Sequence, residues 1–218
     1  LSEDPDCQVL LLEAGRSDRT AICKIPGMMS VLHTVPQVKA MFDWGYKAKQ
    51  RPETIDRKIP YVRGKVMGGS SAINGLLFVR GHRRNYDEWA EEGCTGWDYD
   101  SVLPYFKRSE NQERGGDEWH GEGGPLNVCD QNEKDNVVCD AVIAAAEAVG
   151  IPRNNDVNGA DQEGFGYCQL TVRKARRNST AAAYLDPVRY RKNLTIMTNA
   201  QATRVLLDGK RAVGVEYD

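Results

Sequence analysis

The pattern of apolar and polar residues predicts short strands near both ends of the chain. Gln8 to Ala14 is an apolar run that carries Glu13 near its end and is followed by Gly15. This pattern is typical of a buried parallel strand with a carboxylate at its carboxyl end. Further β-type runs, with a turn signal at Asp208-Gly209, cover residues 194–198, 202–207 and 212–215.

Helical periodicity occurs in the middle of the chain, where helices are predicted over residues 84–92, 100–109 and 135–149. Asp98 or Asp100 is placed to cap the second of these helices. Gly150, followed by an apolar residue and a proline, ends the third.

The segments between these elements are less regular. Residues 16–62 contain four prolines and are predicted to be rich in loops, whereas residues 125–128 and 164–172 read as strands. Arg173 to Arg177 carries four positive charges. We interpret this run as a solvated loop before a helix that starts at Asn178 or Ser179.

Residues 63–87, RGKVMGGSSAINGLLFVRGHRRNYD, concentrate an arginine, paired glycines, hydroxyls and an asparagine. Gly68 and Gly69 have no Cβ, so their amides can approach an anion closely, and Ser70 and Ser71 can cap a following turn. Taken alone, GGSS also fits an ordinary loop before a buried helix. The whole segment favours a backbone pressed against a phosphate-bearing cofactor.

Composition restricts the class of protein. The chain has 29 basic and 31 acidic residues, a net charge of −2 and a pI of about 6.0, which gives no electrostatic case for nucleic acid or anionic membranes. No long apolar span and no signal peptide is present, so a cytoplasmic location is expected. The six scattered cysteines lack metal-ligand spacing and read as reduced, mostly buried thiols.

The chain resembles the glucose/methanol/choline (GMC) oxidoreductases. Nine residues of the central segment match the flavin-binding signature of that family in type and spacing, namely Gly64, Gly68, Gly69, Ser70, Ser71, Asn74, Phe78, Gly81 and Asp87. The resemblance continues over VLLLEAG at 9–15 and NLTIMTNAQATRVLLDGKRAVGVEY at 193–217. Members that oxidise choline or aliphatic alcohols are the most similar.

The resemblance implies an α/β flavin-binding, Rossmann-like domain, incomplete here, with part of an α+β substrate domain built on an antiparallel sheet. The flavin domain would cover residues 1–122 and 193–218, and the substrate domain 123–192. The acidic half of a dinucleotide-binding unit is present at Glu13, but no GxGxxG occurs in the 218 residues. We therefore expect that turn to lie upstream of residue 1.

The resemblance also implies the contacts to FAD. Glu13 would bind the adenosine ribose, Val66 and Gly69 would line the flavin and pyrophosphate, and Trp44 and Ala202 would lie near the cofactor, Ala202 against the adenine through its main chain. Main-chain groups and the Asn74 side chain would fix the isoalloxazine over residues 74–77, namely Asn74, Gly75, Leu76 and Leu77. The position of the histidine that tethers FAD in some members is Ile73, so FAD is expected to be non-covalent.

The implied reaction oxidises a primary alcohol, choline-like or aliphatic, to the aldehyde, with a quinone, a dye-like compound or oxygen as final electron acceptor. The catalytic histidine of the family is expected beyond residue 218. None of His33, His82 and His120 lies in a matching motif, so no catalytic residue is assigned and surface or structural roles are favoured. A FAD-containing hydroxynitrile lyase and a non-catalytic truncated product remain as alternatives.

Overall fold

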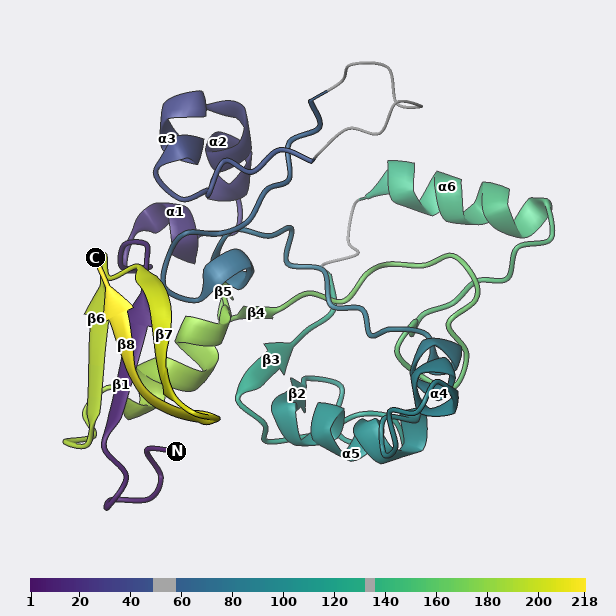
Figure 1. Cartoon of the computed structure of the whole chain (residues 1–218). Coiled ribbons are helices and arrows are strands. Elements are labelled where there is room, and N and C mark those ends of the chain that lie inside the picture. The colour runs from purple at the N-terminus through teal and green to yellow at the C-terminus, as the bar shows by residue number, and fades with distance from the viewer. Residues whose placement is uncertain (49–57, 132–135) are drawn as a thin grey trace. The chain divides into compact units, whose positions relative to one another are not determined.

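The computed structural model describes residues 1–48, 58–131 and 136–218. The chain forms two compact units (Figure 1). Unit 1 consists of Leu1–Gly75 and Ala175–Asp218, and unit 2 of Leu76–Lys174. The division into domains at residues 122 and 192 rests on the family resemblance and stays a prediction.

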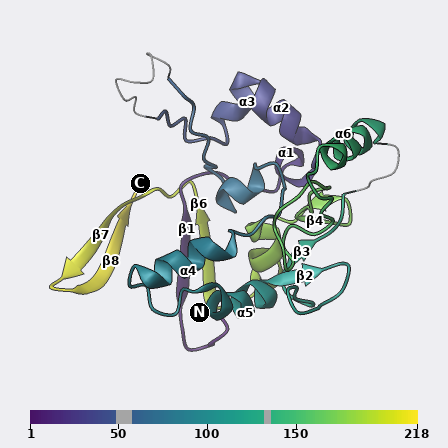
Figure 2. The ribbon, with the colours of Figure 1, turned by 90° about the vertical axis from the view of Figure 1, so that its right-hand side faces the viewer.

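A parallel strand pair joins the two ends of the chain in unit 1. β1, Val9–Glu13, pairs with β6, Leu194–Thr198, in a register that sets Val9 opposite Leu194 and Glu13 opposite Thr198 (Figure 2). The predicted parallel strand is confirmed, but its predicted burial is wrong, since Leu10 is 52% exposed. Among the described residues β1 has a single partner strand, which leaves its other edge uncovered.

The last two strands form the predicted hairpin. β7, Ala202–Asp208, and β8, Arg211–Tyr217, pair antiparallel. Gly209 in the turn takes φ +58°, a conformation that a side chain disfavours. The hairpin exposes apolar side chains along both strands, among them Val205, Leu207, Val213, Val215 and Tyr217.

Three short helices lie in the stretch that was predicted to be loop-rich. They are α1, Ala21–Lys24, α2, Met28–Thr34, and α3, Pro36–Ala40. The prediction failed because these helices have four to seven residues, too short for a helical period to show. Residues 63–87, which carry the flavin-binding signature, are called the signature segment below. Together with the unit 1 part of this segment, the three helices enclose the core of unit 1, which consists of Cys23, Leu32, Phe42, Val66, Ala72 and Ile73.

Unit 1 also contains three irregular helical turns. They are a 3₁₀ turn η1, Gly69–Ala72, a π-helix η2, Ala181–Leu185, and a 3₁₀ turn η3, Asp186–Val188. The short strand β5, Arg176–Arg177, precedes η2. The predicted helix after residue 178 is thus present as η2 and η3.

Two helices of unit 2 match those predicted over residues 84–92 and 100–109. α4, Arg83–Glu91, and α5, Tyr99–Ser109, pack through an edge-on contact of Tyr86 with Phe106, whose ring centroids are 5.7 Å apart. Asp98 caps α5 by accepting a hydrogen bond of 2.9 Å from the Ser101 N–H. Strand β2, Glu110–Gln112, was not predicted and pairs parallel with β3, Leu126–Val128.

The rest of unit 2 is largely irregular. α6, Val137–Ala148, matches the predicted third helix, and β4 covers Val172–Arg173. The strand predicted over 164–172 is wrong in extent. Gly164 takes φ +126°, outside strand geometry, and Leu170 forms only isolated antiparallel bridges to Leu77 and Cys129.

Candidate cofactor site

The glycine pair of the signature segment forms a sharp turn next to β1. Gly68 and Gly69 take φ +87° and φ +56°, and the Gly69 N–H donates a hydrogen bond of 2.7 Å to the Val66 carbonyl. A Cβ on Gly68 would be 3.1 Å from the Ala181 Cβ, whereas one on Gly69 would meet nothing within 4 Å. The Gly69 backbone therefore faces open space, as a backbone that approaches a ligand must.

The chain that leaves β1 lies directly against the segment that leads into this turn. Arg16 forms a parallel bridge with Val66, and its carbonyl accepts a hydrogen bond of 2.9 Å from the Met67 N–H. A Cβ on Gly15 would overlap the main chain of Lys65 and Val66. This close approach brings Glu13, Val66 and Gly69 into one region. Val66 is fully buried, main chain included, so the structure does not expose this predicted cofactor residue to a ligand.

Glu13 ends β1 with its carboxylate held in place. Glu13 Oε1 accepts a hydrogen bond of 2.7 Å from the Gly15 N–H. Partial burial raises the pKa of Glu13, and the Gly15 hydrogen bond and the charge of Lys65 oppose that rise. A half-buried carboxylate at the carboxyl end of a parallel strand is suited to accept hydrogen bonds from ribose hydroxyls.

Trp44 and Ala202 flank the same region. The backbone N–H of Trp44 donates a hydrogen bond of 3.0 Å to the Arg63 carbonyl, and Lys65 Nζ lies 4.6 Å from the centre of the Trp44 ring. Ala202 begins β7 and is exposed, two residues after Ala200, whose N–H donates 2.9 Å to the Glu13 carbonyl.

Residues 73–77, in the middle of the signature segment, alternate between buried and exposed positions. Ile73 is 2% exposed and belongs to the core of unit 1, whereas Asn74 and Gly75 are exposed at the end of that unit. Leu76 and Leu77 open unit 2; Leu76 is buried in a left-handed conformation, φ +70°, and Leu77 is 58% exposed. A left-handed leucine is strained and marks a backbone that its surroundings constrain.

The hydrogen-bond partners of this turn include residues that the sequence did not single out. The Thr180 N–H donates a hydrogen bond of 2.9 Å to Ser71 Oγ, and Thr180 Oγ1 donates one of 3.2 Å to the Gly68 carbonyl. Arg177 Nη1 donates 2.7 Å to Asn74 Oδ1. The solvated-loop interpretation of residues 173–177 is wrong for Arg177, which is 2% exposed. Its neighbour Arg176 is exposed, and nothing in the basic run distinguishes the two.

The three histidines have structural partners. His33 Nε2 lies 3.2 Å from the Ile73 carbonyl, and His82 caps α4 by accepting a hydrogen bond from the Arg84 N–H. His120 is 3% exposed, with Nδ1 3.0 Å from Glu110 Oε1 and Nε2 2.8 Å from Asp156 Oδ2. Glu110 also pairs with the buried guanidinium of Arg80.

We predict an alkaline loss of stability from His120. Hydrogen bonds to Asp156 and then Glu110 raise the pKa of His120 to about 9, above its ordinary 6.5. Its stabilising contribution is therefore fully present below about pH 6.5 and is lost as the pH rises through about 9, on the order of 3 kcal/mol at most. Urea unfolding at pH 6.5 and pH 9.5 measures this loss, and His120→Gln should make the loss smaller. Equal losses in both proteins would contradict the assignment.

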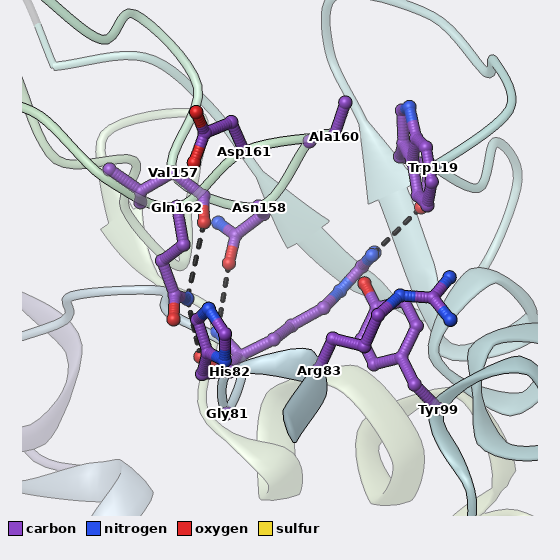
Figure 3. A pocket seen from close by; sticks show the side chains of 12 residues that line it. Gly81, His82, Arg83, Tyr99, Trp119, Val157, Asn158, Ala160, Asp161 and Gln162 are labelled. Carbon is purple, nitrogen blue, oxygen red and sulfur yellow. Dashed lines mark hydrogen bonds between the residues drawn. The ribbon is translucent and has the colours of Figure 1, made fainter. Parts of the chain in front are cut away.

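A small pocket of about 130 Å³ lies beside this network in unit 2 (Figure 3). Asn158 Oδ1 accepts a hydrogen bond of 2.8 Å from the Arg80 N–H, and Gln162 Nε2 donates 2.9 Å to the Arg80 carbonyl. Arg80 Nη1 donates 2.8 Å to the Trp119 carbonyl. These bonds fix the unit 2 part of the signature segment at Arg80, and none of the predicted cofactor residues lines the pocket.

Other kinds of site find no support in the described parts of the chain. No helix in residues 1–48, 58–131 and 136–218 is long and apolar enough to cross a bilayer. Over the same ranges, no three His, Cys, Asp or Glu side chains gather as potential metal ligands. All six cysteines are free, but only Cys23 is buried, so the predicted burial of most of them is wrong.

Comparison with known proteins decides the family. Residues 18–218 match the family model described as GMC oxidoreductase. The chain belongs to the GMC oxidoreductase family. This result confirms the resemblance found in the sequence and the incomplete α/β flavin-binding fold with part of a second domain.

Comparison with individual GMC proteins shows what share of their length this chain covers. The chain is 42% identical to the oxygen-dependent choline dehydrogenase of Vibrio vulnificus and 41% identical to that of Brucella anthropi, over 100% of this chain and 38% and 39% of those proteins. The crystal structure of pyridoxine 4-oxidase from Mesorbium loti matches with a TM-score of 0.89 and 33% identity, over 100% of this chain and 42% of that one. The chain thus spans about two fifths of the length of these relatives.

Proposed function

We propose that this chain is the part of a longer FAD-dependent alcohol oxidoreductase, here called the parent enzyme, that holds the flavin. The observation that carries the proposal is the positive-φ glycine turn at Gly68-Gly69, packed against the chain that leaves β1 just after Glu13. Family membership and the curated relatives, which are choline dehydrogenases, support the same conclusion.

The residues present fit FAD by their chemistry. A half-buried carboxylate at Glu13 suits ribose hydroxyls, and the open space at Gly69 suits a backbone that approaches a pyrophosphate. Residues 74–77, of which Leu76 has a constrained backbone with φ +70°, would supply main-chain groups to the ring system, and Trp44 and Ala202 would flank the cofactor. When bound, FAD supplies the electron-accepting chemistry of the reaction.

The substrate that we propose is a primary alcohol, either choline-like or aliphatic, that is oxidised to the aldehyde. The names of the relatives from Vibrio vulnificus and Brucella anthropi support choline and oxygen as a first choice of substrate and acceptor, with a quinone or dye-like acceptor as the other option. No residue of this chain is assigned to proton transfer, because each histidine is engaged in a structural hydrogen bond. A cytoplasmic location stays a prediction.

Anaerobic addition of choline, or of an aliphatic alcohol, to the yellow parent enzyme tests this function. The flavin absorbance should bleach, because the oxidation of the alcohol delivers its electrons to the cofactor. A hydroxynitrile lyase would keep its flavin colour, and a non-catalytic product would neither bleach nor reduce a dye. Persistent colour with every alcohol tried would contradict the proposal.

We predict that FAD is bound without a covalent tether. Ile73 has no nucleophilic nitrogen, and its side chain is 2% exposed within the core of unit 1. Acid precipitation of the parent enzyme should leave the flavin in the supernatant. A yellow, fluorescent pellet would show a covalent bond and contradict the prediction.

A further inference from the structure

Arg177 contacts the unit 1 part of the signature segment from inside that unit. Arg177 is 2% exposed, and its Nη1 donates a hydrogen bond of 2.7 Å to Asn74 Oδ1 and one of 3.2 Å to the Ser71 carbonyl. Thr180 fixes the beginning of the same turn through Ser71 Oγ and the Gly68 carbonyl. The chain from Arg177 to Thr180 therefore holds both ends of the segment from Gly68 to Asn74.

The contact with Arg177 determines which way the Asn74 amide points. A guanidinium has N–H donors and no acceptor, so Asn74 must present its oxygen to Arg177. The amide nitrogen, the donating end of the side chain, is then directed away from Arg177.

The positive charge of Arg177 has no counter-ion in the part of the chain that the structure describes. No carboxylate there lies within ion-pair distance of Arg177, and its buried Nε and Nη2 have no hydrogen-bond partner among the same residues. Burial lowers the pKa of Arg177, and the nearby Cys23 thiol would raise that pKa only when it is ionised. Burial also raises the pKa of the Cys23 thiol, which therefore stays neutral near pH 7.

We propose that Arg177 is a positioning residue of the flavin-binding segment, which orients the Asn74 amide as a hydrogen-bond donor to the cofactor and places beside it a buried positive charge that has no counter-ion among the described residues. The proposal rests on the function proposed above for residues 74–77. A buried cation without a counter-ion is unfavourable for folding, so its position next to the binding segment indicates a role in binding.

Asn74→Asp separates binding from folding. A carboxylate gives Arg177 a counter-ion, so thermal unfolding of the full chain without cofactor should shift upward by about 2 °C or more. The same change removes the amide donor, so FAD affinity of the parent enzyme should fall about tenfold or more. Gln37→Glu, the same chemical change at an exposed position of unit 1, should move neither quantity appreciably. A lower unfolding temperature, or unchanged affinity, would overturn the proposal.

Arg177→Lys tests whether Arg177 acts on FAD affinity through its contact with Asn74. Lysine keeps the charge but lacks the planar fork, so FAD affinity should fall several-fold and the visible spectrum of the bound flavin should shift. In an Asn74→Ala background the lysine substitution should have little further effect on affinity, because both changes break one contact. Additive losses would overturn the proposal, and exposed Arg176→Lys is the matched control.

The two proposals fail in different ways. A wild-type parent enzyme that binds no FAD would refute the function proposed for the chain. A wild-type enzyme that binds FAD, with variants at Asn74 and Arg177 that bind it equally well, would refute only the role of Arg177.

Discussion

Glu13→Ala should weaken FAD retention by the parent enzyme about tenfold or more. The carboxylate lies at the end of β1, held by the Gly15 N–H, where ribose hydroxyls would donate to it. A hydrogen bond to a charged group contributes roughly 1.5 to 3 kcal/mol, and about 1.4 kcal/mol corresponds to a tenfold change in affinity. Titration of the flavin-free enzyme with FAD, followed by flavin fluorescence, measures the change.

The control for this prediction is Glu91→Ala, at an exposed position on the last residue of α4. It should leave FAD affinity unchanged. Burial raises the pKa of Glu13, so this carboxylate is protonated at a higher pH than an ordinary glutamate. As the solution is acidified, the FAD affinity of the wild-type enzyme should therefore begin to fall at that higher pH. Equal flavin occupancy in the two alanine variants would mean that Glu13 does not bind FAD and that β1 has only a structural role.

Gly69→Ala should reduce FAD affinity about tenfold or more while it destabilises the fold only slightly. The residue has φ +56° with nothing within 4 Å of an added Cβ, so alanine costs about 1 kcal/mol in backbone strain and meets no protein atom. The added methyl group would occupy the space through which the backbone approaches the cofactor. FAD titration and urea unfolding measure the two effects.

Gly209→Ala is the matched control, because Gly209 has φ +58° and also has nothing within 4 Å of an added Cβ. It lies in the turn between β7 and β8, away from the segment at Gly69. The two variants should lose similar stability, and Gly69→Ala alone should lose flavin. A similar flavin affinity in both variants would mean that the open face of Gly69 is unrelated to the cofactor.

The elements that could be predicted from the sequence carry a local signal. β6 and the β7–β8 hairpin were predicted because alternating or continuous apolar runs surround a strong Asp208-Gly209 turn. α5 was predicted because Asp98 supplies a cap at its start. For the site, the glycine spacing and the carboxylate at Glu13 predict the candidate cofactor region, and the structure brings these residues together.

The elements that were missed depend on tertiary contacts. β2 has three residues, Glu110–Gln112, whose polar side chains give no strand pattern, and Glu110 is buried because it pairs with Arg80 and His120. Arg177 belongs to a run of basic residues that predicts solvent exposure, and only the folded chain shows that it reaches Asn74. Buried charges of this kind follow from partners that are distant in sequence.

Hydrogen–deuterium exchange of the parent enzyme, with and without FAD, tests the central claim that residues 66–77 hold the flavin. The account predicts that backbone amides of residues 66–77 exchange more slowly when FAD is bound, whereas those of α6, an exposed helix of unit 2, do not change. Slower exchange elsewhere in the enzyme, with residues 66–77 unaffected, would contradict the account.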